Sequence, residues 1–152
     1  MKTKPQLVYV TYIKTTQKKL WAALTTPEFT RKYWGGMANV SDWKESSTWQ
    51  HVTKGKTPEV YIQGKVEECV PHKRLVLTWA DPDDLKDVSR VTFEIIPFNK
   101  DVRLNVIHGD FKPGSVMSGK VSSGWPVVIA SLKSFLETGK GIDFSCKDAK
   151  GQ

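Results

Sequence analysis

The sequence predicts an α+β fold in which a curved antiparallel β-sheet packs against one long C-terminal helix. Two short helices should follow the first strand of the sheet. Between residues 40 and 107, six stretches alternate apolar and polar residues, which is typical of strands with one buried face. Their connections are too short for crossover helices, so neighbouring strands should be antiparallel. From residue 125 onward, apolar residues recur at helical spacing instead.

The composition is that of one globular domain. The chain has 152 residues, of which 39% are hydrophobic, and this excludes a coiled coil, a collagen-like chain and a long disordered polypeptide. We expect a single domain over residues 1–152, with its core in residues 7–139 and a polar tail in residues 140–152. No apolar signal-peptide region and no run of ~18 apolar residues occurs, so we expect a cytoplasmic protein with no membrane partner.

The first strand is predicted at Leu7–Ile13, which is rich in Val, Tyr and Ile. Thr15 or Thr16 can cap the short helix that follows. The apolar residues on one side of that helix are Leu20, Trp21 and Leu24.

A second short helix should begin at Thr26-Pro27-Glu28. The Thr26 hydroxyl can cap it, Pro27 suits the first helical position, and Glu28 suits the positive end of the helix dipole. Phe29, Tyr33 and Trp34 continue at helical spacing, and Gly35-Gly36 should end the helix.

Six further strands follow in the prediction, at residues 40–43, 47–52, 60–70, 74–80, 88–96 and 102–107. Residues typical of turns separate them, at 54–56, 71–73, 81–84 and 97–100. The last helix has its apolar positions at Trp125, 128/129, Leu132 and 135/136, and Gly139 and Gly141 should end it. Pro126 lies in its first turn or marks a kink after a shorter helical lead-in.

A cavity between sheet and helix follows from their sizes. One helix ~10 Å wide covers only two or three strands spaced ~4.8 Å apart, so large side chains or empty space must fill the remaining concave face. Whether that space is open or filled does not follow from the sequence. The residues expected to line it are Trp34, Trp43, Trp49, Tyr61, Trp79, Phe93, His108, Trp125 and Ile129.

Four segments, in order, resemble one family. They are residues 20–28 with Trp34, residues 64–66 with Pro71 and 74–79, residues 91–94 with 103–108, and residues 124–139. Together they resemble the START-like helix-grip (SRPBCC) superfamily, and within it the branch of activator of heat-shock-protein-90 ATPase homologues. The resemblance implies a curved sheet gripping a C-terminal helix around a hydrophobic cavity. Members include ligand carriers, polyketide cyclases and a co-chaperone domain, so function does not follow from the fold. One departure is Lys19, where the family usually has Glu.

No pattern of catalytic or metal-binding residues stands out. His51, His72 and His108 are scattered, so we expect no zinc site, and no phosphate-binding loop or cofactor motif occurs, so we expect no cofactor. By strand alternation His108 faces the helix, either as a hydrogen-bonded core residue or as a polar contact for a ligand. The aspartates between residues 81 and 87 are expected to form a solvated loop. Cys69 and Cys146 are not expected to form a disulfide.

The net charge of +7 lies entirely in residues 1–56. A basic surface patch is expected at Lys14, Lys18, Lys19, Arg31 and Lys32. Such a patch is either a solvated surface or a site for an acidic protein partner. Nucleic acid is not an expected partner, because no recognised binding motif is present.

These observations leave three functional hypotheses open. The first is a non-enzymatic protein that binds a small apolar or amphipathic ligand; a cavity below ~300 Å³ together with no bound ligand in purified protein would contradict it. The second is a cyclase- or dehydratase-type enzyme, which would need a carboxylate or Tyr within hydrogen-bond reach of His108. The third is a co-chaperone-like activator of a chaperone ATPase, with the basic surface facing an acidic partner.

Overall fold

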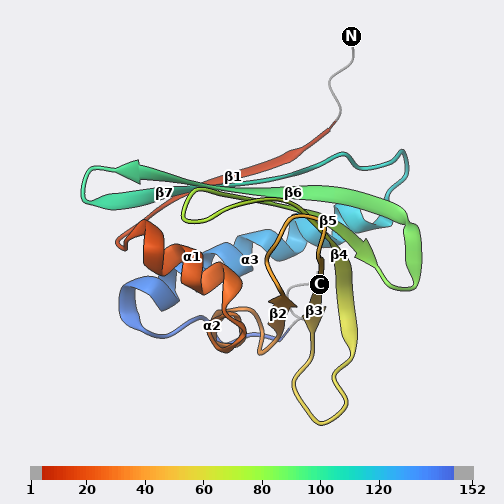
Figure 1. Ribbon diagram of the computed structural model, residues 1–152, viewed down its shortest axis with the longest axis horizontal. Coiled ribbons are helices and arrows are strands. Elements are labelled where there is room, and N and C mark those ends of the chain that lie inside the picture. Colours follow the sequence, from red (N-terminus) through yellow and green to blue (C-terminus); the bar gives the residue numbers. More distant parts are fainter. Residues whose placement is uncertain (1–4, 146–152) are drawn as a thin grey trace.

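The computed structural model describes residues 5–145 and has the predicted α+β architecture (Figure 1). The strands are β1 (Leu7–Ile13), β2 (Ala38–Ser41), β3 (Thr48–Val52), β4 (Val60–Val70), β5 (Arg74–Asp81), β6 (Asp84–Phe98) and β7 (Asp101–Gly109). The helices are α1 (Gln17–Thr25), α2 (Pro27–Tyr33) and α3 (Val116–Thr138). The long helix α3 runs along the concave side of the sheet, with α1 and α2 beside it.

The seven strands form one antiparallel sheet in the order β1-β7-β6-β5-β4-β3-β2. The predicted meander is therefore confirmed, and β1 completes the sheet by pairing with β7. Several predicted strand boundaries were wrong, since β2 covers residues 38–41 instead of 40–43 and β6 begins at residue 84 instead of 88. Trp43 lies outside β2 with a left-handed φ of 55°, and β6 continues through Pro97, which pairs with Val102. The β6–β7 turn is therefore confined to Asn99 and Lys100.

Both short helices form where predicted, but only one has a hydroxyl cap. The Thr16 hydroxyl accepts a hydrogen bond of 3.1 Å from the Lys19 N–H. The Thr26 hydroxyl caps nothing, contrary to the prediction, and its backbone carbonyl accepts the Phe29 and Thr30 N–H groups instead. The Thr30 hydroxyl in turn accepts the Asn39 N–H at 3.0 Å, which ties α2 to β2.

Helix α3 begins at Val116, so Pro126 lies inside it and the lead-in alternative is correct. Proline has no N–H to donate to the carbonyl four residues earlier, which belongs to Ser122. The Tyr9 hydroxyl of β1 donates to that carbonyl at 3.4 Å. Gly139, with φ of 87°, ends the helix as predicted.

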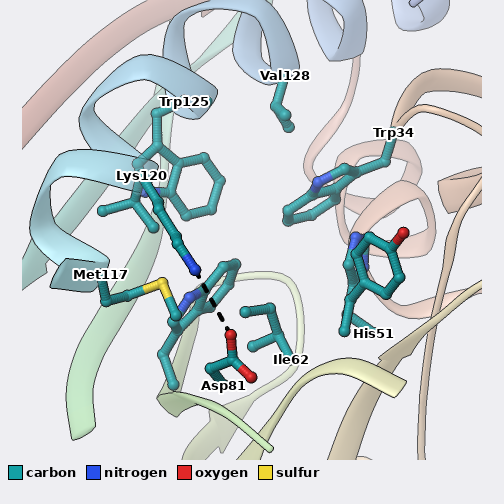
Figure 2. A pocket seen from close by; sticks show the side chains of 12 residues that line it. Trp34, His51, Ile62, Asp81, Met117, Lys120, Trp125 and Val128 are labelled. Carbon is teal, nitrogen blue, oxygen red and sulfur yellow. Dashed lines mark ion pairs between the residues drawn. The ribbon is translucent and has the colours of Figure 1, made fainter. Parts of the chain in front are cut away.

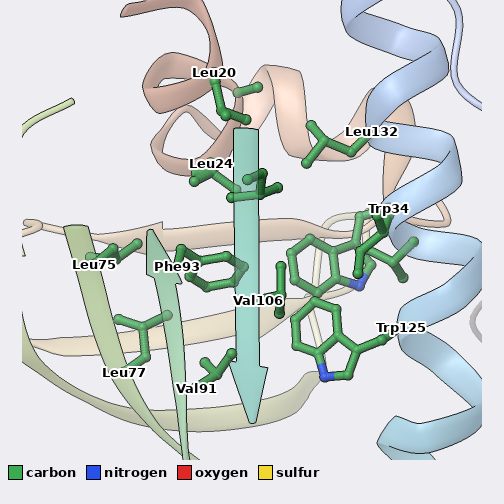
Figure 3. Close-up of a cluster of buried hydrophobic side chains, with 14 of the residues drawn as sticks. Leu20, Leu24, Trp34, Leu75, Leu77, Val91, Phe93, Val106, Trp125 and Leu132 are labelled. Atoms are coloured by element: carbon green, nitrogen blue, oxygen red, sulfur yellow. The ribbon is translucent and has the colours of Figure 1, made fainter. Parts of the chain in front are cut away.

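The core lies between the concave face of the sheet and α3. Figure 3 shows Leu20 and Leu24 of α1 near Leu132, and Trp34, directly after α2, beside Trp125. On β7, Leu104, Val106 and His108 are almost fully buried, as strand alternation predicted. Within residues 5–145, no helix is long and apolar enough to cross a membrane.

Candidate functional site

A cavity opens between the first half of α3 (residues 116–125) and strands β3–β5 (Figure 2). It is lined by Trp34, His51, Tyr61, Ile62, Trp79, Asp81, Met117, Lys120, Val121, Gly124, Trp125 and Val128. The cavity has a volume of about 80 Å³.

Three indole rings take up most of the space that a helix of this width leaves over the sheet. Trp34 and Trp125 have ring centroids 5.5 Å apart, Trp79 and Trp125 also 5.5 Å, and Trp34 and Trp79 6.4 Å. The cavity is consequently smaller than the ~300 Å³ typical of sites for drug-sized ligands. The cavity volume thus meets the first of the two conditions that together would contradict ligand binding. The second, the absence of a bound ligand in purified protein, is decided by a binding measurement.

An ion pair stands at the mouth of this otherwise apolar cavity. The Lys120 Nζ of α3 lies 3.6 Å from the Asp81 Oδ2 at the end of β5, and the two side chains are 37% and 26% exposed. Figure 2 shows the pair reaching across between helix and sheet. Among the described lining residues, Lys120 carries the one ammonium group and Asp81 the one carboxylate, both at the mouth, and His51 contributes an imidazole to the wall.

Asp87 is not part of a solvated loop, and that prediction was wrong. It is 2% exposed, and its carboxylate accepts the Ser115 hydroxyl at 2.7 Å and the Met117 N–H at 3.0 Å. Burial alone would raise the pKa of Asp87, but the hydrogen bonds and nearby Lys112 outweigh it and lower the pKa. An ionised Asp87 therefore holds the N-terminus of α3 against β6.

His51 of β3 lies at the cavity wall and is 4% exposed. Its Nδ1 donates to the Asn39 Oδ1 at 2.6 Å, and its ring centroid lies 5.0 Å from that of Trp34. The hydrogen bond fixes the orientation of the imidazole at the cavity wall.

His108 is fully buried behind Trp125 and belongs to a directional hydrogen-bond chain. The Trp125 indole N–H donates to Nδ1 at 3.0 Å, which leaves the proton on Nε2 to be donated to the Ser89 hydroxyl at 2.7 Å. Burial lowers the pKa of His108 from 6.5 to about 3, so the ring is neutral near pH 7. Neither partner is the carboxylate or tyrosine that the enzyme hypothesis requires.

Trp49 reaches across β4 instead of pointing into the cavity. Its indole N–H donates to the Thr78 carbonyl of β5 at 2.7 Å. It pairs in register with Gly64 of β4, where an added Cβ would lie 2.0 Å from that same carbonyl oxygen. A glycine at this position is what allows the three strands to approach so closely.

The structure brings four of the nine predicted cavity residues together at the wall: Trp34, Tyr61, Trp79 and Trp125. Five others lie elsewhere: Trp43, Trp49, Phe93, His108 and Ile129. Trp43 is half-buried in the loop after β2, and Phe93 and His108 lie behind Trp125. Ile129 follows Val128 on α3 and is buried in the core.

Sequence reasoning missed eight lining residues: His51, Ile62, Asp81, Met117, Lys120, Val121, Gly124 and Val128. Four of the eight come from the first half of α3, where a helical lead-in before Pro126 was one of the two alternatives left open. Met117, Val121 and Trp125 follow one another at intervals of four, and this spacing could have revealed the helix. The two glycines and Pro126 in the same segment concealed it.

The five residues of the predicted basic patch lie in different surroundings. Lys18 and Lys19 are exposed in the first turn of α1, and the Lys14 N–H donates to the Glu137 carboxylate at 2.9 Å. Arg31 and Lys32, in the last turn of α2, border a second, open groove of about 510 Å³ together with Lys140. Asp143 also borders the groove, so three cationic side chains face one carboxylate and a local excess of positive charge remains.

In the described part of the chain, no three His, Cys, Asp or Glu side chains lie close enough together to hold a metal ion. Cys69 is a free thiol in β4, and Cys146 lies outside the described residues.

A curved antiparallel sheet around a long C-terminal helix defines the START-like helix-grip class of proteins, which confirms the resemblance in the motifs. The chain belongs to the family described as "Activator of Hsp90 ATPase homolog 1-like protein", which matches residues 14–137. No curated protein matches the chain closely enough to count as a relative.

Solved structures share the fold at low sequence identity. The Aha1 dimer from Colwellia psychrerythraea is 21% identical, with a TM-score of 0.72 over 90% of this chain and 99% of that one. CalU16 from Micromonospora echinospora is 18% identical, with a TM-score of 0.69 over 88% and 77%. Protein MLL2253 from Mesorhizobium loti is 26% identical, with a TM-score of 0.69 over 87% and 96%.

Proposed function

We propose that the protein binds a small apolar or amphipathic molecule in the cavity between the sheet and α3, without catalysing a reaction. The observation that carries the proposal is a wall of three indole rings with an ion pair at its mouth. Apolar surface covered on binding contributes ~25 cal/mol per Å² before the costs of association, and a polar mouth suits an amphipathic ligand.

The cavity must widen for most ligands, and the first half of α3 is suited to this. It contains Gly119 and Gly124, and Pro126 removes one helical hydrogen bond directly after it. At its outer end the attachments are polar: the Lys120–Asp81 pair and the bonds from Ser115 and Met117 to Asp87. A modest displacement of this segment would enlarge the space without unpacking the second half of the helix.

Catalysis has less support. His108, the candidate acid or base, donates to a serine and accepts from an indole, and its lowered pKa keeps it neutral. It does not line the cavity, because Trp125 covers it. A binding role therefore accounts for the geometry with fewer assumptions than a cyclase or dehydratase.

The test is native mass spectrometry of the purified protein, followed by binding titrations with the retained molecule or with small aromatic probes. Val128→Phe places a ring in the cavity, and Val127→Phe makes the same change one residue away, outside the lining. We expect Val128→Phe to abolish binding and Val127→Phe to preserve it. Equal binding by both variants, or no ligand and no probe binding in the wild type, would contradict the proposal.

A second candidate is association with an acidic protein surface, favoured by the groove that Arg31, Lys32 and Lys140 border. The family description suggests a chaperone ATPase as the partner, and such a role would place the protein in the cytoplasm. The test is the ATPase rate of the chaperone with wild-type protein and with an Arg31→Glu, Lys32→Glu variant. An unchanged rate, or binding that does not weaken with salt, would remove this candidate.

A further inference from the structure

We propose that the indole N–H of Trp79 is the hydrogen-bond donor that recognises the ligand. The ligand would then be a compact, uncharged, largely apolar molecule with one hydrogen-bond acceptor, such as a carbonyl or ether oxygen. This inference rests on the proposed binding function and adds to it a recognising atom and a chemical class.

Three neighbouring indoles differ in one respect. The Trp49 N–H donates to the Thr78 carbonyl at 2.7 Å, and the Trp125 N–H donates to His108 at 3.0 Å. The Trp79 N–H is buried and has no acceptor. Within residues 5–145, only one other buried side-chain nitrogen or oxygen lacks a partner, the Thr15 hydroxyl, and Thr15 does not line the cavity.

An unpaired buried donor lowers the stability of the protein, and a ligand that supplies an acceptor would restore the lost hydrogen bond. Trp79 is 5% exposed and lies in the middle of the aromatic group, with the rings of Trp49, His108 and Trp125 at 5.2–5.5 Å. A buried polar group without a partner destabilises the protein, because its bond to water is lost on folding and not replaced. An acceptor brought in by a ligand would restore that bond.

The surroundings restrict what else the ligand can carry. The lining carboxylate and ammonium groups, of Asp81 and Lys120, are paired with each other at the mouth, and the Nδ1 of His51 is bonded to Asn39, so a charged ligand group would have to displace an existing partner. The free space of about 80 Å³ favours a molecule with few atoms. The donor is covered in the unliganded protein, and Met117 is the unbranched, flexible lining side chain best able to yield.

The experiment compares two probes of the same shape, acetophenone and α-methylstyrene, in which a carbonyl oxygen replaces a methylene group. Dissociation constants are measured for the wild type, Trp79→Phe, Trp34→Phe and Trp43→Phe. Trp34→Phe removes another indole of the cavity wall, and Trp43→Phe removes one outside it. We expect Trp79→Phe alone to lose about tenfold of the preference for the ketone, which is the strength of one buried hydrogen bond.

A second readout needs no variant. In the nitrogen-15 spectrum of the wild type, the Trp79 indole signal should lie further downfield with acetophenone than with α-methylstyrene. The aromatic rings of the two probes cause the same ring-current shift, so the difference between the two spectra reports the hydrogen bond. If both probes bind and Trp79→Phe keeps the full preference, or Trp34→Phe loses it equally, the assignment to Trp79 is overturned while the proposed function stands. Binding of neither probe would overturn both proposals.

Discussion

The interface between α3 and the sheet has two unlike halves. Its leucine-containing half, formed by the second half of α3, brings Leu132 near Leu20 and Leu24 of α1 (Figure 3), and Phe135 of the same half packs on Tyr33. Its aromatic half, formed by residues 116–125, brings Trp125 against Trp34 and Trp79 and contains the cavity. Leucine side chains adapt to fill space, whereas rigid rings with polar edges leave gaps and need hydrogen-bond partners. The same helix thus packs in the closed core at one end and borders the cavity at the other.

The largest expected difference between the halves is the cost of truncating a buried side chain. Leu132 and Met117 both lie on α3 and are 3% and 4% exposed. We expect Leu132→Ala to lower the free energy of unfolding by about 3 kcal/mol, because it creates a new void in a closed core. Met117→Ala should cost about half as much, because Met117 already borders free space. Urea denaturation of both variants measures this, and equal costs would remove the distinction between the halves.

The second difference concerns pH and centres on His108. Because its pKa is lowered from 6.5 to about 3, the unfolded chain binds a proton in this window that the folded protein does not. The contribution of the neutral His108 to the free energy of unfolding is therefore fully present above pH 6.5. It is lost as the pH decreases below that value, by up to about 1.4 kcal/mol per pH unit. The rings and hydroxyl around it, from Trp79, Ser89 and Trp125, carry no charge that would titrate there.

Thermal or urea unfolding of the wild type and of His108→Gln at pH 5.0–6.5 isolates this contribution, because the carboxylates are common to both proteins. We expect the stability of His108→Gln to change less over this range than that of the wild type. A wild type as pH-sensitive as the variant would mean that His108 is not held neutral by the fold.

Two indoles of the aromatic half offer a more direct comparison. Trp125→Phe removes the donor to His108 and leaves a buried acceptor unpaired, which should cost about 2 kcal/mol beyond the smaller ring. Trp79→Phe removes a donor that has no acceptor, so it should cost less than Trp125→Phe. Denaturation midpoints of the two variants test this. A larger loss for Trp79→Phe would show that its N–H has a partner in solution.

The fold could be predicted from the sequence more fully than the site, and particular residues show why. Strand alternation and short turns are local signals, so β1 and β4 were placed with their observed bounds. The start of α3 was left unplaced, with a helical lead-in before Pro126 as one of two alternatives, because Gly119, Gly124 and Pro126 are poor helix formers. Tertiary contacts stabilise that segment: Asp87 holds its N-terminus and Tyr9 compensates for the proline. Neither contact has a signature in the local sequence.

The composition of the cavity wall depends on tertiary contacts even more than the start of α3 does. Strand alternation correctly predicted that His108 faces the helix. It did not predict that Trp125 lies in front of His108 and separates it from the cavity. Trp49 was expected in the cavity because it is an inward-facing aromatic residue, and Gly64 on the neighbouring strand gives it another place. Which large residue occupies which space is decided between elements, and the pattern within one element does not contain it.

The smallest expected effect on stability is at the mouth of the cavity. Lys120→Met keeps the length and apolar stem of the side chain and removes its charge, and because both members of the Lys120–Asp81 pair are partly exposed, the loss should be below about 1 kcal/mol. Ligand exchange should respond more strongly. If the pair holds the first half of α3 over the cavity, its removal should raise the association and dissociation rates of a bound probe together, with little change in affinity. Stopped-flow or NMR exchange measurements distinguish this from unchanged rates, which would mean that the aromatic half opens elsewhere.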